Sequence, residues 1–264
     1  MALAERLLDP VAIPKPIATI DMLDGQAGGG QLELAVRIAM LLKRPIAFID
    51  DAYCRVASLG PAEVRAIARH PAFRAPMNRA IEDSLGIATA GIDGEMLSRL
   101  SSSPWSRLAV VIATAPMEEV RQVAWILAAA VLSKRIRGLV LKADRELARE
   151  TLGADEFDIA THEAPVLHPA LCELDARPGK QPLFTMDSNA AGRRQQIMGF
   201  GLQIAGRFLD ASEPVLGSLF SLRVPPSANY PEREHFVRPF GEAHCRQVVK
   251  LIRRRQQSWS VIIG

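Results

Sequence analysis

Cysteines and aromatic residues are both scarce in this chain of 264 residues. The three cysteines, Cys54, Cys172 and Cys245, are widely spaced and form no C-x-x-C pair. An odd and scattered set of cysteines excludes a disulfide framework and predicts a reducing compartment. Aromatic residues make up 5% of the chain. This low content argues against a β-sandwich or a β-barrel, because strands are enriched in aromatic residues.

The chain also has no large excess of charge of either sign. The 32 Lys and Arg residues nearly balance the 29 Asp and Glu residues, which leaves a formal net charge of +3. So small a net charge does not predict binding to a polyanion, and a nucleic-acid role would require a local basic patch. We therefore expect no nucleic-acid partner.

No apolar run is long enough to cross a membrane. The longest runs, residues 108–117 and 123–132, are each about half of what a bilayer core requires, so both are predicted to be buried core helices. Near the N-terminus, Glu5, Arg6 and Asp9 interrupt the apolar stretch that a secretory signal needs. We therefore expect a cytoplasmic protein.

Prolines and glycines mark the expected ends of helices. A proline in the first helical turn costs no hydrogen bond, because the N–H that it lacks would be unpaired there. Four prolines mark such starts: Pro61, Pro104, Pro116 and Pro214. The third predicted helix should reach about residue 137, because apolar residues recur along it at helical spacing and Gly138 follows.

Helices are also predicted over residues 188–209 and 241–256. The glycines of the first of these suggest close packing against a neighbouring helix, because glycine disfavours a helix that stands alone. Strand signals are confined to residues 45–49 and 139–141, with residues 261–263 as a short third candidate. The expected fold is mostly α, a compact helical domain with little or no sheet.

The common catalytic signatures are missing, since the chain has no P-loop, no H-E-x-x-H pair and no G-x-S-x-G elbow. One glycine cluster, at residues 25–30, precedes a predicted helix. Its backbone N–H groups could face a phosphate at that helix N-terminus. The cluster resembles the opening motif of RNA 3′-terminal phosphate cyclases, which makes a nucleotide-dependent enzyme the alternative hypothesis. The simpler interpretation is a flexible glycine hinge before the first helix, and we expect no enzyme activity.

A possible zinc-binding set lies between residues 162 and 172. His162, Glu163, His168 and Cys172 all carry side chains that can bind zinc. Their spacing matches no known zinc pattern, and prolines are frequent over residues 165–182, so we interpret this stretch as an irregular connection. We expect no metal and no cofactor. The pair Asp50 and Asp51 is likewise interpreted as a turn or a helix cap.

The predicted C-terminal helix is clearly amphipathic. Four apolar residues should face inward: Cys245, Val248, Val249 and Ile252. On the outside, Arg246, Lys250 and Arg254 recur at every fourth position, and Arg253 and Arg255 widen this stripe. The candidate partner interface is Arg246, Lys250, Arg253, Arg254 and Trp259, because tryptophan is frequent at binding hot spots. An acidic protein surface, anionic lipid and RNA are the possible partners, and a solvated face is the simpler interpretation.

Four segments, in order, resemble the SctK family (YscK, HrpD and NolU-like proteins) of type III secretion systems. They are residues 50–87, 103–120, 123–140 and 201–227, the last of which ends in a turn similar to the family's Leu-Arg-Leu-Pro. Ser133 stands where the family usually has a histidine. On this resemblance, residues 1–44 are an N-terminal extension with the glycine hinge and a first helix, and residues 45–264 are the SctK-like helical domain.

The resemblance implies a non-enzymatic adaptor of the cytoplasmic sorting platform. Such an adaptor links the cytoplasmic domain of the inner-membrane ring protein SctD to the pod protein SctQ. It thereby helps to position SctL and the SctN ATPase. The expected location is the cytoplasmic face of the inner membrane, which the adaptor reaches through its protein partners.

Overall fold

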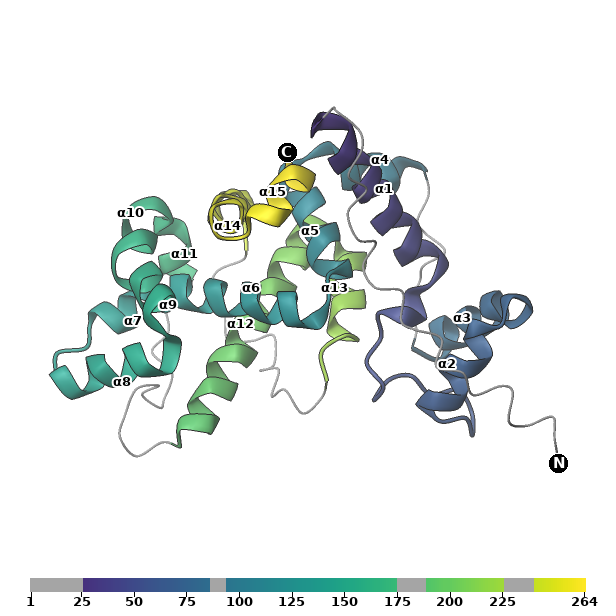
Figure 1. Ribbon diagram of the computed structural model, residues 1–264, viewed down its shortest axis with the longest axis horizontal. Helices are drawn as coiled ribbons and strands as arrows, with labels where there is room; N and C mark the ends of the chain where they lie inside the picture. The colour runs from purple at the N-terminus through teal and green to yellow at the C-terminus, as the bar shows by residue number, and fades with distance from the viewer. Residues whose placement is uncertain (1–25, 86–93, 175–188, 226–239) are drawn as a thin grey trace.

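The computed structural model describes residues 26–85, 94–174, 189–225 and 240–264, and these residues are almost entirely helical (Figure 1). Within these ranges no strand forms, and the single β-bridge joins Val56 to Leu59. The expectation of a mostly α fold is therefore confirmed. In the same ranges, no helix combines the length and the apolar character that crossing a bilayer requires.

The N-terminal half comprises α1 (Gln26–Lys43), the 3₁₀ turn η2 (Pro45–Ala47), α2 (Pro61–Arg69), α3 (Pro71–Leu85), α4 (Gly94–Ser102), α5 (Pro104–Thr114) and α6 (Met117–Val131). The middle of the chain comprises α7 (Ser133–Arg137), α8 (Lys142–Leu152), α9 (Ala154–Asp158), the π-helical turn η4 (Ile159–Glu163), α10 (Ala164–Leu167) and α11 (Pro169–Leu174). The last part comprises α12 (Ala190–Ser212), α13 (Pro214–Ser221), α14 (Glu242–Arg255) and α15 (Gln257–Ile263).

The core is centred on α5, α6 and residues 197–209 of α12, which are mostly buried. The two apolar runs that were predicted to be core helices form α5 and α6, as expected. Gly201 lies where α12 meets α6, and a Cβ at this position would overlap the carbonyl group of Ala124. The predicted close packing of this glycine-containing helix is therefore confirmed.

Local signals explain several of the helix ends. Ser103 caps α5, because its hydroxyl accepts a hydrogen bond from the backbone N–H of Ser106 at 3.1 Å. The helix predicted from Pro116 to residue 137 is interrupted at Leu132, so that α6 and α7 follow one another, and Gly138 closes α7. The predicted C-terminal helix is confirmed as α14.

A second, smaller core lies beneath α2 and α3, to the right in Figure 1. Its buried apolar residues are Ile46, Ile49, Cys54, Val64, Ala68 and Ile81. This part of the chain joins the main core beside α13, where the backbone N–H of Asp50 donates to the carbonyl oxygen of Leu222 at 2.8 Å. The chain between η2 and α3 thus forms a distinct packing unit that remains attached to the rest.

Helix α1 belongs to the main core. Its residues Leu34, Ile38 and Leu41 are buried there, and it packs against α5 and α15. Gly30 touches α15 so closely that a Cβ would overlap the carbonyl group of Val261. The expected boundary at residue 44 therefore does not separate an extension from the domain, since α1 completes the domain's own core. Residues 1–25 lie outside the described residues.

Some local expectations are wrong. Residues 164–174 are not irregular, because α10 and α11 occupy them: Pro165 stands in the first turn of α10 and Pro169 is the first residue of α11. The three strand candidates also fail, since residues 45–47 form a 3₁₀ turn, residues 139–141 form no regular element and residues 261–263 end α15. A short apolar run fits a strand or a buried helix equally well, so periodicity could not decide between them.

Candidate functional site

Helix α14 carries the surface that the sequence singles out. Its buried residues are Cys245, Val248, Val249, Leu251 and Ile252, which include all four residues that were predicted to face inward. They anchor α14 against α5, α11 and α12. This packing fixes which side of the helix faces solvent.

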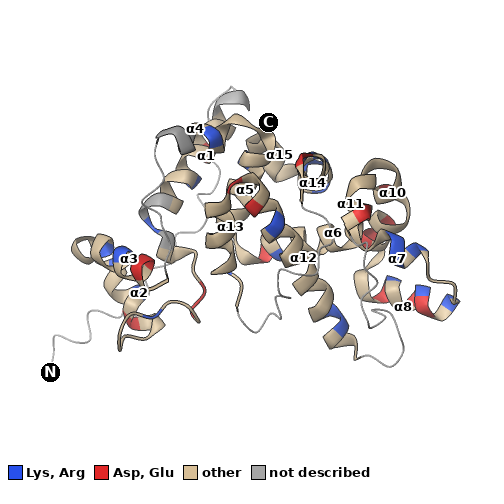
Figure 2. Cartoon of the chain, turned by 180° about the vertical axis from the view of Figure 1, so that it is seen from behind, with Lys and Arg blue, Asp and Glu red and all other residues tan. Residues whose placement is uncertain are grey.

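Three cations share that outer side, and we call Arg246, Lys250 and Arg254 the basic face. Figure 2, in which Lys and Arg are blue, shows α14 nearly end-on with blue segments on it. All three are exposed. They recur at every fourth residue, so neighbouring charges are about 6 Å apart along the helix axis. Arg246 pairs with Glu242 at 2.5 Å, one turn earlier, in the order that favours a helix.

Two other members of the predicted interface behave differently. Trp259 is only 3% exposed, and its indole N–H donates to a carboxylate oxygen of Glu119 at 3.1 Å. The prediction that Trp259 is a surface anchor is therefore wrong, because α15 folds back and packs it into the core. Arg253 is partly buried, and Arg255, expected to widen the stripe, turns away from solvent.

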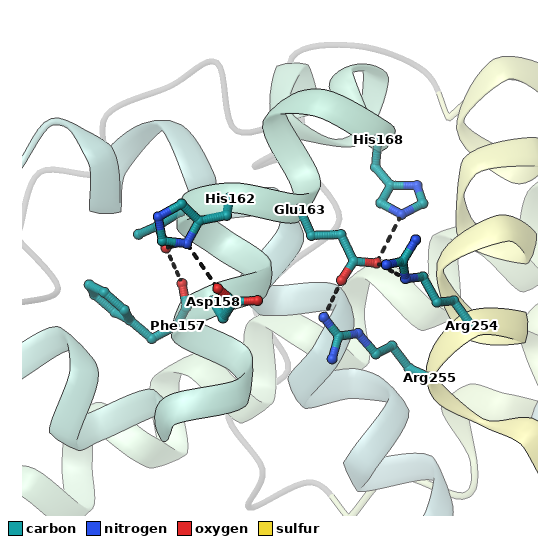
Figure 3. A network of polar contacts seen from close by, with 8 residues as sticks. Phe157, Asp158, His162, Glu163, His168, Arg254 and Arg255 are labelled. Carbon is teal, nitrogen blue, oxygen red and sulfur yellow. Dashed lines mark hydrogen bonds and ion pairs between the residues drawn. The ribbon is translucent and has the colours of Figure 1, made fainter.

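Arg255 instead enters a buried network centred on Glu163, at the end of the π-helical turn η4 (Figure 3). One carboxylate oxygen of Glu163 accepts a hydrogen bond from Arg255. The other oxygen lies 3.5 Å from Nε of Arg254 and 3.6 Å from Nε2 of His168. The network thus ties α14 to the segment formed by η4, α10 and α11, and the backbone N–H of Leu171 reinforces this contact by donating to Gln247 at 3.2 Å.

Burial disfavours the charged form of His168 in this network. It is 2% exposed, and burial lowers its pKa, although the nearby carboxylate of Glu163 acts in the opposite direction. Glu163 is also buried. An acid or a base must reach its substrate, and these two groups lie beneath the surface. Their arrangement is therefore suited to holding helices together.

The possible zinc-binding set is divided by the fold. Glu163 and His168 meet, but His162 is 78% exposed on its side chain and contacts Asp158 at 2.9 Å. The thiol of Cys172 donates to the carbonyl oxygens of Ala130 and His168, each at 3.6 Å. Burial raises the pKa of this thiol, which disfavours the thiolate that would bind a metal. Over the ranges described, no three potential metal ligands gather at one point.

The glycine cluster is neither a hinge nor a loop over the part that is described. Residues 26–30 form the first turn of α1, and Gly30 packs against α15. Gly25 lies outside the described residues. The aspartate pair forms a turn, as expected, because Asp50 accepts a hydrogen bond from the N–H of Ala52 at 2.9 Å.

Two of the clefts lined by described residues are of notable size, and neither gathers a reactive set of side chains. One has a volume of about 570 Å³ and lies between α1, α4, α5 and α15, with mostly apolar walls. Its one charged lining residue, Arg107, already donates to the carbonyl oxygens of Ser101 and Ile263. The other, of about 530 Å³, lies between α6, α8 and α12, and two of its lining residues are joined by a hydrogen bond from the indole N–H of Trp125 to the carbonyl oxygen of Leu152.

Arg223 is a buried arginine with a structural role that the sequence did not predict. It is buried after α13 and donates to the carbonyl oxygens of Ile112, Ala113 and Ala115 at the C-terminal end of α5. Burial lowers its pKa to about 10, so that it stays charged at neutral pH and complements the negative end of that helix. The available signal was the turn that resembles Leu-Arg-Leu-Pro, in which Arg223 is the arginine.

The clearest feature of the described surface is the basic face, which the buried network holds in place from below. Comparisons of the chain with protein-family models, with curated proteins and with solved structures found no match.

Proposed function

We propose that this chain is a non-enzymatic adaptor of a type III secretion sorting platform. It would link the cytoplasmic domain of SctD to SctQ, and so help to position SctL and the SctN ATPase at the cytoplasmic face of the inner membrane. The observation that carries the proposal is the placement of the four segments that resemble the SctK family. Over their described parts they contain α2 and α3, α5 with the start of α6, the rest of α6 with α7, and the later part of α12 with α13.

Most of these segments meet in one place. Helix α12 packs along α6 and against α13, and α5 contacts both α12 and α13. A resemblance that follows the packed core in order is better support than scattered apolar helices would be. The arginine of the fourth segment, Arg223, bonds to the end of α5, so two of the segments are also joined by a specific polar contact.

An adaptor needs two separate faces, and the chain offers two of different chemistry. The basic face lies on α14. On α1, Leu32, Val36 and Met40 recur at every fourth residue and are all exposed. One partner could therefore be held mainly by charge and the other mainly by apolar contact.

Deletion of the gene in the source bacterium tests this function. We expect effector secretion to be lost while the membrane rings still assemble, and an affinity-tagged copy to restore secretion and to copurify SctD and SctQ. Normal effector export after deletion would contradict the proposal. Restoration by the tagged copy controls for effects on neighbouring genes.

A further inference from the structure

Beside the basic face, α10 exposes two apolar side chains, Val166 at 75% and Leu167 at 40%. They follow Glu163, the last residue of the π-helical turn η4, by three and four residues. Glu163 points toward α14, where it meets Arg254 and Arg255 (Figure 3). Val166 and Leu167 are therefore exposed on the short helix that directly follows this link to α14.

Two further contacts tie the segment that carries this apolar pair to α14. His168, which follows Leu167, lies 3.6 Å from the carboxylate of Glu163, and the same oxygen lies 3.5 Å from Arg254 of the basic face. The start of α11 is bonded to Gln247, which neighbours Arg246 on α14. We call Val166 and Leu167 the apolar step, since they form an uncharged border to the three cations.

We propose that the basic face and the apolar step form one docking surface for an acidic amphipathic helix of a partner protein. Carboxylates at every fourth residue of that helix would match the cations, which are about 6 Å apart along α14. An apolar residue on its flank would cover Val166 and Leu167. This inference deepens the proposed adaptor function, and its biological meaning rests on that function.

The charge on this surface is available to a partner. Among the described residues Lys250 makes no ion pair, while the pair between Arg246 and Glu242 is exposed and contributes little. Arg254 contacts Glu163 at 3.5 Å and still exposes most of its side chain. A carboxylate brought to Lys250 would therefore meet a cation that has no competing ion pair in the described chain.

An acidic protein fits this surface better than a membrane or RNA does. The apolar side of α14 is buried in the core and is not available to enter a bilayer. Recognition of anionic lipid usually takes about 4–8 clustered cations, and the basic face has three. Binding of single-stranded RNA relies on exposed aromatic side chains, and Trp259, the tryptophan nearest in sequence, is buried.

The test uses the full chain and a short capped peptide with glutamate at every fourth position and leucine on the adjoining face. Binding is measured by fluorescence anisotropy at low salt and at about 0.5 M salt. The charge variant is Arg246→Glu with Lys250→Glu. Its matched control is Lys142→Glu with Arg145→Glu, at the start of α8, where both cations are also exposed and Glu146 offers a similar i,i+4 partner. Circular dichroism verifies that every variant keeps its helices.

We expect the peptide to bind, and high salt or the charge variant to weaken it by about tenfold or more, while the control variant binds as the parent does. The substitution Val166→Ser should weaken binding without changing its salt dependence. Absence of peptide binding, or equal binding by the charge variant, would overturn the inference. It would also be overturned if phosphatidylserine vesicles or a poly-uridine RNA bound more tightly than the peptide and were lost in the same charge variant.

These outcomes are separable from those of the proposed function. If the peptide binds as expected and deletion leaves secretion intact, the docking surface stands and the secretion function fails. If deletion abolishes secretion and the peptide does not bind, the adaptor function stands and this inference fails.

Discussion

His168 shows how the fold decides the chemistry of one residue. A histidine five residues after a glutamate could have been a metal ligand, an acid or a base. In the structure it is buried against Glu163, within reach of the charges of Arg254 and Lys250 on α14. Burial outweighs the attraction of Glu163 and lowers the pKa of His168, so that folding favours the neutral imidazole over the charged one.

This residue should make stability depend on pH. In the unfolded chain His168 takes up a proton near its ordinary pKa of 6.5, whereas the folded chain resists protonation until a lower pH. The free energy of unfolding therefore keeps its full value above the unfolded-state pKa of His168. It decreases as the pH falls from there toward the folded-state pKa, by at most about 1.4 kcal/mol per pH unit. Urea unfolding at about pH 7.5 and about pH 5.5 measures the loss.

The substitution His168→Gln should remove this part of the pH dependence. His162→Gln is the matched control, because His162 lies nearby on an exposed surface. Carboxylates that lie away from both histidines affect the parent and both variants alike, so the difference between the two variants reports on His168 together with its contact to Glu163. Equal slopes in the parent protein and in His168→Gln would contradict the expectation.

At the scale of the element, the contact between α6 and α12 brings the two helix backbones directly together. Gly201 allows it, since the backbone of α6 at Ala124 occupies the space that a side chain would need. Gly192 lies on the same helix, and a Cβ added there would have no atom of another residue within 4 Å beyond its own helical backbone. One helix thus offers a packed glycine and an open one, which makes a matched pair.

Alanine substitution should have opposite effects at the two glycines. Gly201→Ala should lower the free energy of unfolding by about 2 kcal/mol or more, because backbone must move to admit the methyl group. Gly192→Ala should raise it by up to about 1 kcal/mol, because alanine is the better helix former. Both changes are measured by urea unfolding. If the two variants were equally stable, α6 and α12 would not approach each other as described.

Helices were predictable where the signals are local. The prolines at the starts of α2, α5 and α13 and the apolar faces of α12 and α14 belong to single segments, so a sequence contains them in full. The partners of Glu163 could not be predicted in this way, since Arg254 and Arg255 come from a helix about ninety residues away. The same holds for Trp259, whose burial depends on Glu119 and on the way α15 folds back.

At the scale of the whole molecule, the two cores differ in size, and the boundary between them was not predictable. The resemblance to the SctK family suggested a division at residue 44, but α1 packs into the main core and the smaller unit starts after it. Which helix covers which face is decided by contacts between distant segments. A sequence pattern shows that a face is apolar and does not show what covers it.

The smaller core should open more easily than the main one. Its apolar cluster has few members, and burial of apolar area is the main source of stability in each unit. Native-state hydrogen exchange should therefore show that amides of α2 and α3 exchange through a partial opening, while those of α5, α6 and α12 require global unfolding.

The substitution Ile81→Ala tests directly whether the smaller core opens by itself. Ile81 is fully buried in the smaller core, and loss of its side chain should cost about 2–4 kcal/mol. If the smaller unit opens by itself, the protection of α2 and α3 falls by that amount while the protection of α6 and α12 is unchanged. An equal fall in α6 and α12 would mean that the bond from Asp50 to Leu222 and the contacts around it join both cores into one cooperative unit. Exchange rates of the parent and the variant, measured under the same conditions, decide between these two outcomes.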